Sequence, residues 1–418
     1  MKKSVLILCD MFPPAFGPRM GYLCKYLKNN GWNPAVIAED VEEETFSFLA
    51  KQLQQLKIDV TFIRYYRKKG WTGKVEWGWT FLRDTLFNYK DKRIYREALR
   101  KSEHHHFNLI LCSTYRTFPM QAARRLSRKT GLPLIVDLRD IIEQYTGHEF
   151  ITRPLPKLFG LDKFIAFIFK KRNLSIRNRI LREAAYVTTV SPWHVSVLSV
   201  FNKNTKLIYN GYDPDIFYPR YKKNDIFIIT YTGRIHSTAM RNPDLLFQAV
   251  QRLANNHIID IDKFRIRWYV DEKSGQIIKK EAENYSGISL FMDYYGYIPA
   301  SKIPEALHDS EILLLLTNKS DANGPKGVMT TKLFESLAVG KPILCVRGDE
   351  GCIEEVINRT CAGLSAHTAD EVYDFIKSHY LRWESGLPYE DNSDRNEIEK
   401  FSREAQAQQF MTVIARNE

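Results

Sequence analysis

The first forty residues alternate between two kinds of apolar pattern, and this alternation constrains the fold more than any other feature of the chain. An apolar run at residues 4–9 has the length of a buried strand, and a loop rich in proline and glycine follows it. Residues 20–30 carry apolar side chains at helical spacing up to Gly31, and residues 34–38 form a second apolar run. A strand, a helix and a strand in so short a stretch predict a parallel, doubly wound α/β sheet.

The same alternation continues through the 418 residues, which is long enough for two domains. Further strands are expected at residues 108–112, 133–137, 186–190, 206–210, 227–231, 264–270, 288–291, 312–316 and 342–346. Helices are expected at residues 121–130, 243–255, 304–308, 331–339 and 401–414. A turn-rich stretch at residues 210–215 separates the two halves. We therefore predict two Rossmann-like doubly wound domains with a cleft between the carboxyl edges of their sheets.

The two halves differ in charge. Residues 1–210 contain 36 Lys and Arg against 18 Asp and Glu, whereas residues 211–418 contain 25 against 31. The basic half favours an anionic partner such as a membrane surface, a phosphorylated substrate or nucleic acid, although cations that only solvate helix faces explain it equally well. No apolar run approaches the roughly 20 residues of a membrane-spanning helix, and the run at residues 4–9 is too short for a signal peptide. The six cysteines contain no CxxC pair, so we expect reduced thiols in a cytoplasmic protein.

Two loops that follow expected strands have residues suited to an anionic ligand. In the first, Gly17 allows the backbone to approach a ligand, and Arg19 lies where the helix begins. In the second, Gly233 and Arg234 follow the strand at residues 227–231, and Arg241 lies seven residues further on. Two arginines at this spacing suit a diphosphate, which each guanidinium can bind bidentately. An ordinary strand–helix connection or a surface arginine after a turn would look similar.

A third stretch, residues 324–344, combines a glycine-rich loop, a short helix, a C-terminal glycine and a strand. Thr330 and Thr331 stand at the expected helix start, where amides and hydroxyls can bind phosphate. Glu335 lies one turn further on and is suited to accept two ribose hydroxyls. The alternative is an acidic residue that the helix dipole favours near the N-terminus.

With these residues in place, the chain resembles the GT-B glycosyltransferases, specifically the large retaining family four, over nearly its whole length. Residues 332–342, which begin at Lys332, resemble the nucleotide-sugar helix of that family, in which the glutamate holds the ribose. Other stretches resemble the family's interdomain segment, diphosphate loop, first loop, strand end and acceptor-side segment, and these are residues 210–219, 232–234, 12–17, 191–193 and 136–140.

The resemblance implies an acceptor-side domain at residues 1–210, a nucleotide-sugar domain at 211–395 and a helix at 396–418 that crosses back to the first domain. It implies that the donor is bound by Gly17, Arg19, Gly233, Arg234, Arg241, Thr330, Thr331, Lys332 and Glu335. Arg139 and Asp140 are the catalytic candidates; Asp140 would position the acceptor, and a structural cap is an equally good explanation of that carboxylate. No metal or other cofactor is expected, because arginines and helix amides would neutralise the leaving diphosphate.

Two segments suggest contact with a membrane. Residues 151–182 carry nine Lys and Arg against Asp162 alone, and they enclose apolar runs at 158–161 and 164–169. Aromatic residues flanked by cations suit an anionic bilayer surface, and residues 65–71 with Trp77 and Trp79 suit a second patch. A core-packed helix with a solvated basic face is the alternative, with equal weight.

The function expected from these features is transfer of a hexosyl group from a nucleotide diphosphate-sugar to a lipid-linked or polysaccharide acceptor in surface-glycan biosynthesis. The protein would act in the cytoplasm, peripherally on the inner face of a membrane. Gly327 stands where family members usually have a first glutamate, so a catalytically silent scaffold that binds a nucleotide or a partner is one alternative. A GT-B sugar epimerase is another, although the acid and histidine motifs of that family are not evident. A nucleic-acid-binding protein is the third and ranks last, because no recognition motif supports it.

Overall fold

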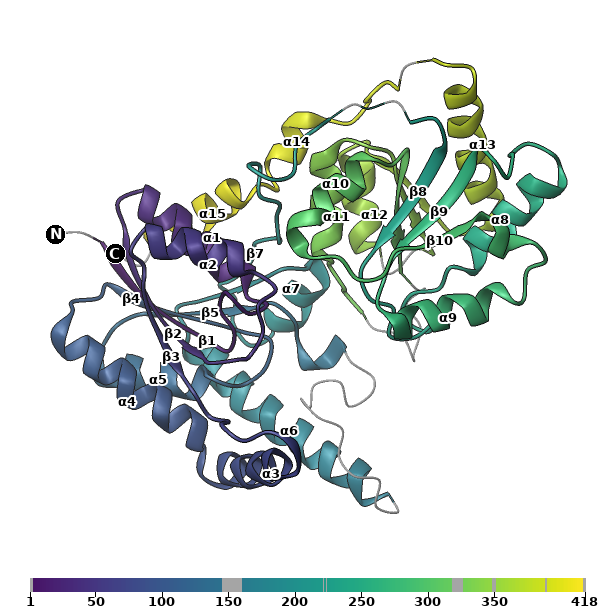
Figure 1. The fold of residues 1–418 in the computed structure, drawn as a ribbon. Helices are drawn as coiled ribbons and strands as arrows, with labels where there is room; N and C mark the ends of the chain where they lie inside the picture. Colours follow the sequence, from purple (N-terminus) through teal and green to yellow (C-terminus); the bar gives the residue numbers. More distant parts are fainter. Residues whose placement is uncertain are drawn as a thin grey trace. The chain divides into compact units, whose positions relative to one another are not determined.

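The chain consists of two compact units, each built around one parallel β-sheet (Figure 1). The computed structural model describes residues 3–144, 160–220, 222, 224–317, 326–347, 351–387 and 389–415. The N-terminal unit comprises Met1–Tyr209 and Gln406–Glu418, and the C-terminal unit comprises Asn210–Ala405. Helices cover both faces of each sheet, so the prediction of two doubly wound α/β domains is confirmed.

The sheet of the N-terminal unit has seven parallel strands in the order β3-β2-β1-β4-β5-β6-β7. The strands are β1 (Ser4–Cys9), β2 (Asn33–Glu39), β3 (Asp59–Ile63), β4 (Leu109–Thr114), β5 (Leu134–Leu138), β6 (Tyr186–Thr189) and β7 (Thr205–Leu207). The helices are α1 (Pro18–Asn29), α2 (Ser47–Gln55), α3 (Gly70–Phe87), α4 (Tyr89–His104), α5 (Met120–Thr130), the 3-10 turn η1 (Ile142–Gln144), α6 (Leu161–Glu183), α7 (Pro192–Leu198) and most of α15 (Arg403–Ala415).

Two apolar cores cover the two faces of this sheet, because successive side chains of a strand point to opposite faces. On β1, Val5 and Ile7 belong to the core that α1, α2 and α15 complete, whereas Leu6 and Leu8 belong to the core under α4, α5 and α6. The last helix contributes Phe410, whose side chain is fully buried in the first of these cores. Helix α15 is therefore part of the unit that contains β1.

The sheet of the C-terminal unit has six parallel strands in the order β10-β9-β8-β11-β12-β13. The strands are β8 (Phe227–Thr232), β9 (Phe264–Tyr269), β10 (Met292–Tyr294), β11 (Ile312–Leu316), β12 (Ile343–Val346) and β13 (Gly363–Ala366). The helices are α8 (Asp244–Asn255), α9 (Glu272–Ala282), η2 (Ile288–Phe291), η3 (Ala300–Lys302), α10 (Ile303–His308), α11 (Thr331–Val339), α12 (Cys352–Arg359), α13 (Ala369–Glu384) and α14 (Arg395–Glu399).

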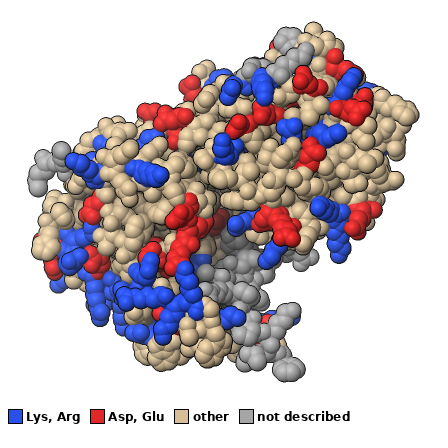
Figure 2. Space-filling view, viewed as in Figure 1, with Lys and Arg blue, Asp and Glu red and all other residues tan. Residues whose placement is uncertain are grey.

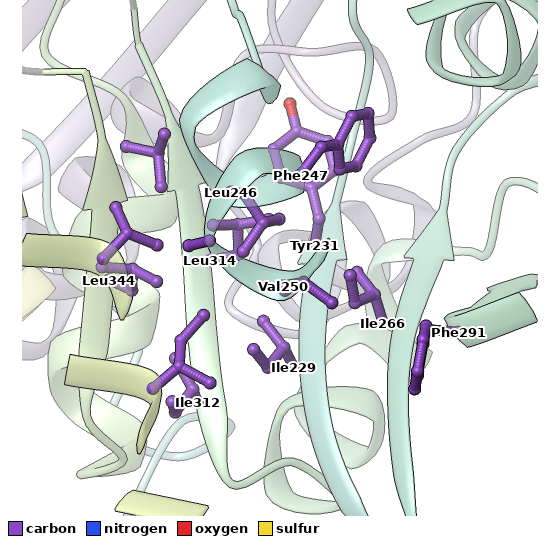
Figure 3. Close-up of a cluster of buried hydrophobic side chains, with 14 of the residues drawn as sticks. Ile229, Tyr231, Leu246, Phe247, Val250, Ile266, Phe291, Ile312, Leu314 and Leu344 are labelled. Atoms are coloured by element: carbon purple, nitrogen blue, oxygen red, sulfur yellow. The ribbon is translucent and has the colours of Figure 1, made fainter. Parts of the chain in front are cut away.

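One face of this sheet packs on α8 through a large apolar core (Figure 3). Ile229 of β8, Ile266 of β9 and Leu314 of β11 point from neighbouring strands towards Leu246 and Val250 of α8. All five side chains are buried, with at most 3% exposed. This core fixes the carboxyl ends of β8 and β11, which is the edge where doubly wound sheets bind ligands.

Two local differences from the expected elements have identifiable causes. Residues 288–291 form a 3-10 turn rather than a strand, because Gly287 adopts φ 74° and turns the chain, and the strand follows at Met292–Tyr294. Residues 40–107 hold β3 and three helices that no sequence pattern indicated. Among the described residues, no helix has both the length and the apolar content needed to cross a membrane.

Candidate functional site

In the C-terminal unit, the loop after β8 and the start of α11 lie in close contact. Gly233 follows β8 directly with φ 115°, and its N–H donates to the carbonyl of Tyr269 at 2.9 Å. A Cβ at this position would lie 2.3 Å from Nζ of Lys332. Glycine is needed here because a residue with a side chain is strained at this φ, and the lysine of α11 occupies the space where a Cβ would lie.

The predicted cations gather around this contact. Nζ of Lys332 lies 5.5 Å from the ring centre of Tyr231, and Arg241 donates a hydrogen bond to the carbonyl of Arg234. A cavity of about 40 Å³ lies here, lined by Tyr231, Met240, Arg241, Leu315, Leu316, Thr317, Val328, Thr330, Lys332 and Ile353. The side chain of Arg234 is exposed and its Nε lies 3.2 Å from the carboxylate of Asp271. Four predicted donor residues, Gly233, Arg241, Thr330 and Lys332, are thus brought together.

The N-terminus of α11 presents the positive end of a helix at the same place. Thr330 is the N-cap, and its hydroxyl oxygen accepts a hydrogen bond from the N–H of Lys332 at 3.4 Å. Thr331 is the first helical residue and is half-buried. The first turn of a helix adds amide donors that favour an anion.

Two ionisable side chains on α11 have strongly shifted pKa values. Burial, together with the nearby charge of Arg241, lowers the pKa of Lys332 to about 7. Burial raises the pKa of Glu335 to about 7, against the opposing attraction of Arg403 and Lys332. Among the described residues, no hydrogen bond to the Glu335 carboxylate contributes to this shift. A half-buried carboxylate with unused acceptors can bind hydroxyl groups of a ligand.

Three residues of this region were not predicted from the sequence. The guanidinium of Arg234 lies 5.5 Å from the ring centre of Tyr297, and burial together with Arg241 and Arg234 lowers the pKa of His236. Arg403 approaches Glu335 from a segment 68 residues away. His236 and Tyr297 could have been predicted as site residues, because they follow the carboxyl ends of β8 and β10. Nothing in the sequence near Arg403 indicates that it lies at the site.

In the N-terminal unit, Arg19 is buried and makes contacts within the protein. Its guanidinium lies 3.0 Å from the carboxylate of Asp137, and the two side chains are 2% and 0% exposed. It also donates to the carbonyls of Ile208 and Tyr209, each at 2.9 Å. These contacts fasten α1 to β5 and to the end of the unit, so Arg19 has a structural role, and the donor contact expected for it stays a prediction.

Gly17 also serves the packing of the chain itself. It is buried at the start of α1, and a Cβ there would lie 2.6 Å from the carbonyl oxygen of Met11. The loop after β1 folds back onto this position, so the absence of a side chain accommodates protein backbone.

The two catalytic candidates lie at the carboxyl end of β5. Arg139 forms an ion pair of 2.5 Å with Asp10, which follows β1, and the hydroxyl of Thr114 donates to the same carboxylate at 3.1 Å. Asp140 is half-buried and accepts a hydrogen bond from Nε2 of Gln144 at 3.2 Å. Burial raises the pKa of Asp140 to about 6, although the charge of Arg139 opposes that shift. Asp10 was not predicted; its position directly after the first strand is the available signal.

A cavity of about 660 Å³ lies entirely within the N-terminal unit and was not predicted. Its walls come from the carboxyl ends of β1, β2 and β4 and from α3, α4 and α6. Aromatic side chains line much of it: Tyr66, Trp77, Phe81, Tyr115, Phe118 and Phe169. Charged residues line the rest, among them Asp10, Glu39 and Arg116. Aromatic faces with a few polar groups are typical of ligand cavities.

The two segments with a membrane-like pattern are described in part. Residues 145–159, including Arg153 and Lys157, lie outside the described residues, and residues 161–182 belong to α6. Tyr65 does not belong to a surface patch, because it is 6% exposed and its hydroxyl donates to the carbonyl of Lys90. Trp71 and Trp79 are exposed on α3. Within the described ranges, no three His, Cys, Asp or Glu side chains are grouped as metal ligands would be.

Comparisons with known proteins identify the fold. No protein-family model matches the sequence. No curated protein matches it. Among solved structures, the chain is similar to a glycosyltransferase from Rickettsia africae, with 15% identity, a TM-score of 0.63, and coverage of 100% of this chain and 98% of that one. It is similar to Anabaena Alr3699/HepE, solved with UDP and glucose (13% identity, TM-score 0.59, 99% and 100% coverage). It is also similar to a sucrose-phosphate synthase from Thermosynechococcus elongatus (14% identity, TM-score 0.62, 99% coverage of both chains). With two Rossmann-like domains, each built on a parallel sheet, the chain has the GT-B fold of these glycosyltransferases.

Proposed function

We propose that this protein transfers a sugar from a nucleoside diphosphate donor to an acceptor hydroxyl. One observation carries the proposal: Arg241, Lys332 and the N-terminus of α11 meet at one place, and the open carboxylate of Glu335 lies one turn further along the helix. Cations with helix amides suit a diphosphate, and a carboxylate suits the ribose hydroxyls. The Anabaena protein of the same fold was solved with UDP and glucose, which supports this class of donor.

The proposed chemistry breaks the bond between the anomeric carbon of the sugar and the diphosphate oxygen. The diphosphate leaves with the electron pair, and the acceptor oxygen forms the new bond to the anomeric carbon and gives its proton to an oxygen of the leaving diphosphate. Arg241 and Lys332 would neutralise the charge that develops on the diphosphate, in a reaction that needs no metal. Retention at the anomeric carbon and a hexosyl donor are part of the proposal, and they rest on the sequence resemblance.

We further propose a lipid-linked or polysaccharide acceptor, bound by the N-terminal unit during surface-glycan assembly on the inner face of a membrane. Asp140 would position the acceptor hydroxyl by accepting its hydrogen bond, since a pKa of about 6 leaves the carboxylate mostly ionised at neutral pH. Its ion-paired neighbour Arg139 would hold the loop that carries it.

A thermal-shift screen against UDP, GDP, CDP, dTDP and ADP, each with common sugars attached, tests the donor site. A nucleotide that binds the folded protein raises the unfolding midpoint by mass action, so one nucleotide should stand out. The proposal fails if no nucleotide changes the midpoint. If a nucleotide sugar binds but is neither hydrolysed nor transferred, the protein is a silent scaffold, which Gly327 in place of the usual glutamate already favours as the second candidate.

A further inference from the structure

Helix α3 exposes a continuous apolar stripe. Trp71, Val75, Trp79, Leu82 and Leu86 are each between 47% and 76% exposed. At about 100° per residue, these five positions fall within about 80° of the helix circumference. We call these residues the α3 stripe. Large apolar side chains gathered on one exposed face mark an interaction site, because scattered exposed residues would not keep helical spacing.

The opposite side of the same helix lines the 660 Å³ cavity. Trp77, Phe81 and Asp84 are among the cavity-lining residues, and Thr80 between them is 6% exposed. The helix therefore fulfils its packing role through this side alone. The α3 stripe is not buried by the packing of the N-terminal unit, so that packing does not explain why these exposed residues are apolar.

Helix α6 extends the apolar surface. Phe164, Ile165, Phe167 and Ile168 in its first turns are between 38% and 59% exposed. The rings of Phe81 on α3 and Phe169 on α6 stack with their centres 5.7 Å apart, so the two helices lie side by side (Figure 1). The exposed residues of α6 and the α3 stripe thus belong to neighbouring helices of one unit.

Basic side chains border this apolar surface. The exposed residues Arg67, Lys68 and Lys69 directly precede α3, Lys74 lies on it, and all four are also among the residues that line the cavity. On α6, Lys163 and Lys171 are exposed, and Lys69 is the one of these six with a described ion pair, to Glu42 at 3.1 Å. Figure 2 shows Lys and Arg gathered over the N-terminal unit next to the uncharged surface where α3 lies. This charge complements an anionic surface, and it would repel the same face of a second copy.

We propose that the α3 stripe and the exposed apolar residues of α6 dock the protein on an anionic lipid surface. Tryptophan and other apolar side chains would enter the interface, and the bordering lysines would pair with lipid phosphates. If the protein is the sugar transferase proposed above, this surface also indicates the class of acceptor. Because α3 forms a wall of the cavity, an acceptor that reaches the cavity from the lipid surface is lipid-linked rather than a free polysaccharide.

Binding to vesicles tests the docking face without any assay of transfer. The full-length protein should sediment with phosphatidylcholine vesicles that contain phosphatidylglycerol, and much less with phosphatidylcholine alone. The triple variant Trp79→Ser, Leu82→Ser, Leu86→Ser should lower the partition coefficient by about tenfold or more. Val200→Ser is the matched control, because Val200 is 77% exposed elsewhere in the same unit and should bind like wild type.

Tryptophan fluorescence gives a second readout that does not depend on folding of the triple variant. Brominated lipids should quench the wild-type protein, and Trp71→Phe with Trp79→Phe should remove most of that quenching. Trp77→Phe should keep it, because Trp77 lines the cavity.

Several results overturn the docking face: no binding by the wild type, equal binding by the triple variant, or quenching that survives in the Trp71→Phe, Trp79→Phe protein. A wild-type dimer without lipid that becomes a monomer in the triple variant also overturns it, since a second copy would then cover the face. The nucleotide-induced thermal shift reports on the donor site separately. If the wild-type protein binds vesicles but no nucleotide shifts its unfolding midpoint, the result contradicts the proposed function and still supports the docking face.

Discussion

At the scale of single residues, the carboxylate of Glu335 is the most informative group of the donor site. It is half-buried on α11 and its pKa is raised to about 7, so burial of its charged form costs free energy. Such a cost is understandable if a ligand supplies hydrogen-bond donors.

Glu335→Ala should therefore weaken binding of the cognate nucleotide by about 1–3 kcal/mol, because two ribose hydroxyls lose their acceptor. Isothermal titration calorimetry measures this directly. Glu305→Ala on α10, which removes an exposed carboxylate of the same unit, should leave the affinity unchanged. Equal affinity of wild type and Glu335→Ala would contradict the ribose assignment.

Lys332 gives the site a dependence on pH. Its pKa is lowered to about 7, so the side chain is increasingly neutral in the free protein above pH 7. A bound diphosphate favours the ammonium form, so binding takes up a proton and affinity should fall as the pH rises, by up to about tenfold per pH unit between pH 7.5 and 9.

Lys332→Arg should abolish this fall, because a guanidinium stays charged throughout the range. Calorimetry in buffers of different ionisation enthalpy measures the proton uptake, which should approach one proton near pH 8.5 for wild type and be absent in Lys332→Arg. A flat affinity profile for wild type would show that the lysine does not contact the diphosphate.

At the scale of elements, the final helix belongs to the core of the N-terminal unit. Phe410 on α15 is fully buried among apolar residues of β1, β2 and α1, and the guanidinium of Arg19 lies 5.0 Å from its ring centre. Phe410→Ala should lower the free energy of unfolding by about 3–5 kcal/mol, because it leaves a cavity in a packed core. Urea unfolding checks the value, with exposed Gln409→Ala as the control. A loss below about 1 kcal/mol would mean that α15 adds little to that core.

Some helices and strands can be predicted from the residues next to them in the sequence, and others cannot. The bounds of α11 were predicted correctly at residues 331–339, because Thr330 caps its start and Gly340 with φ 75° ends it. The strand expected at residues 288–291 was wrong, since an apolar run of four residues fits a buried 3-10 turn as well as a strand. Helix α3 was not predicted, because apolar residues lie on both its cavity side and its exposed side. The sequence therefore lacks the one-sided apolar spacing by which a helix is recognised.

At the scale of the whole molecule, a ligand in one unit should be visible as local protection. We expect the cognate nucleotide to slow amide hydrogen exchange in residues 232–241 and 330–335 of the C-terminal unit. The core strands β1 and β4 of the N-terminal unit should exchange as before. Mass spectrometry of peptic peptides measures both. Protection confined to the N-terminal unit would place the nucleotide in the wrong half for the proposed site.

The candidate site was predictable only where its residues follow strands of their own unit. Gly233 and Arg241 were predicted from their place after a strand, Thr330 from its place at a helix start and Lys332 from the family resemblance, and the structure brings these residues together at one sheet edge. Arg19 also lies in the first turn of a helix that follows a strand. It pairs with Asp137, which is 118 residues away in the sequence, and no pattern near residue 19 indicates this partner. The cavity between α3 and the sheet was missed for the same reason, since it depends on packing between distant segments.

The return of α15 to the first core has a consequence for how the protein is made. A ribosome produces β1 and α1 long before α15, so their core lacks Phe410 until α15 has emerged. The C-terminal unit is complete at Ala405, so it can fold while its older neighbour still exposes an apolar face. Of the two units, the N-terminal unit thus begins to form before the C-terminal unit and is completed after it. A truncated product that stops before α15 would expose that apolar face to chaperones and proteases.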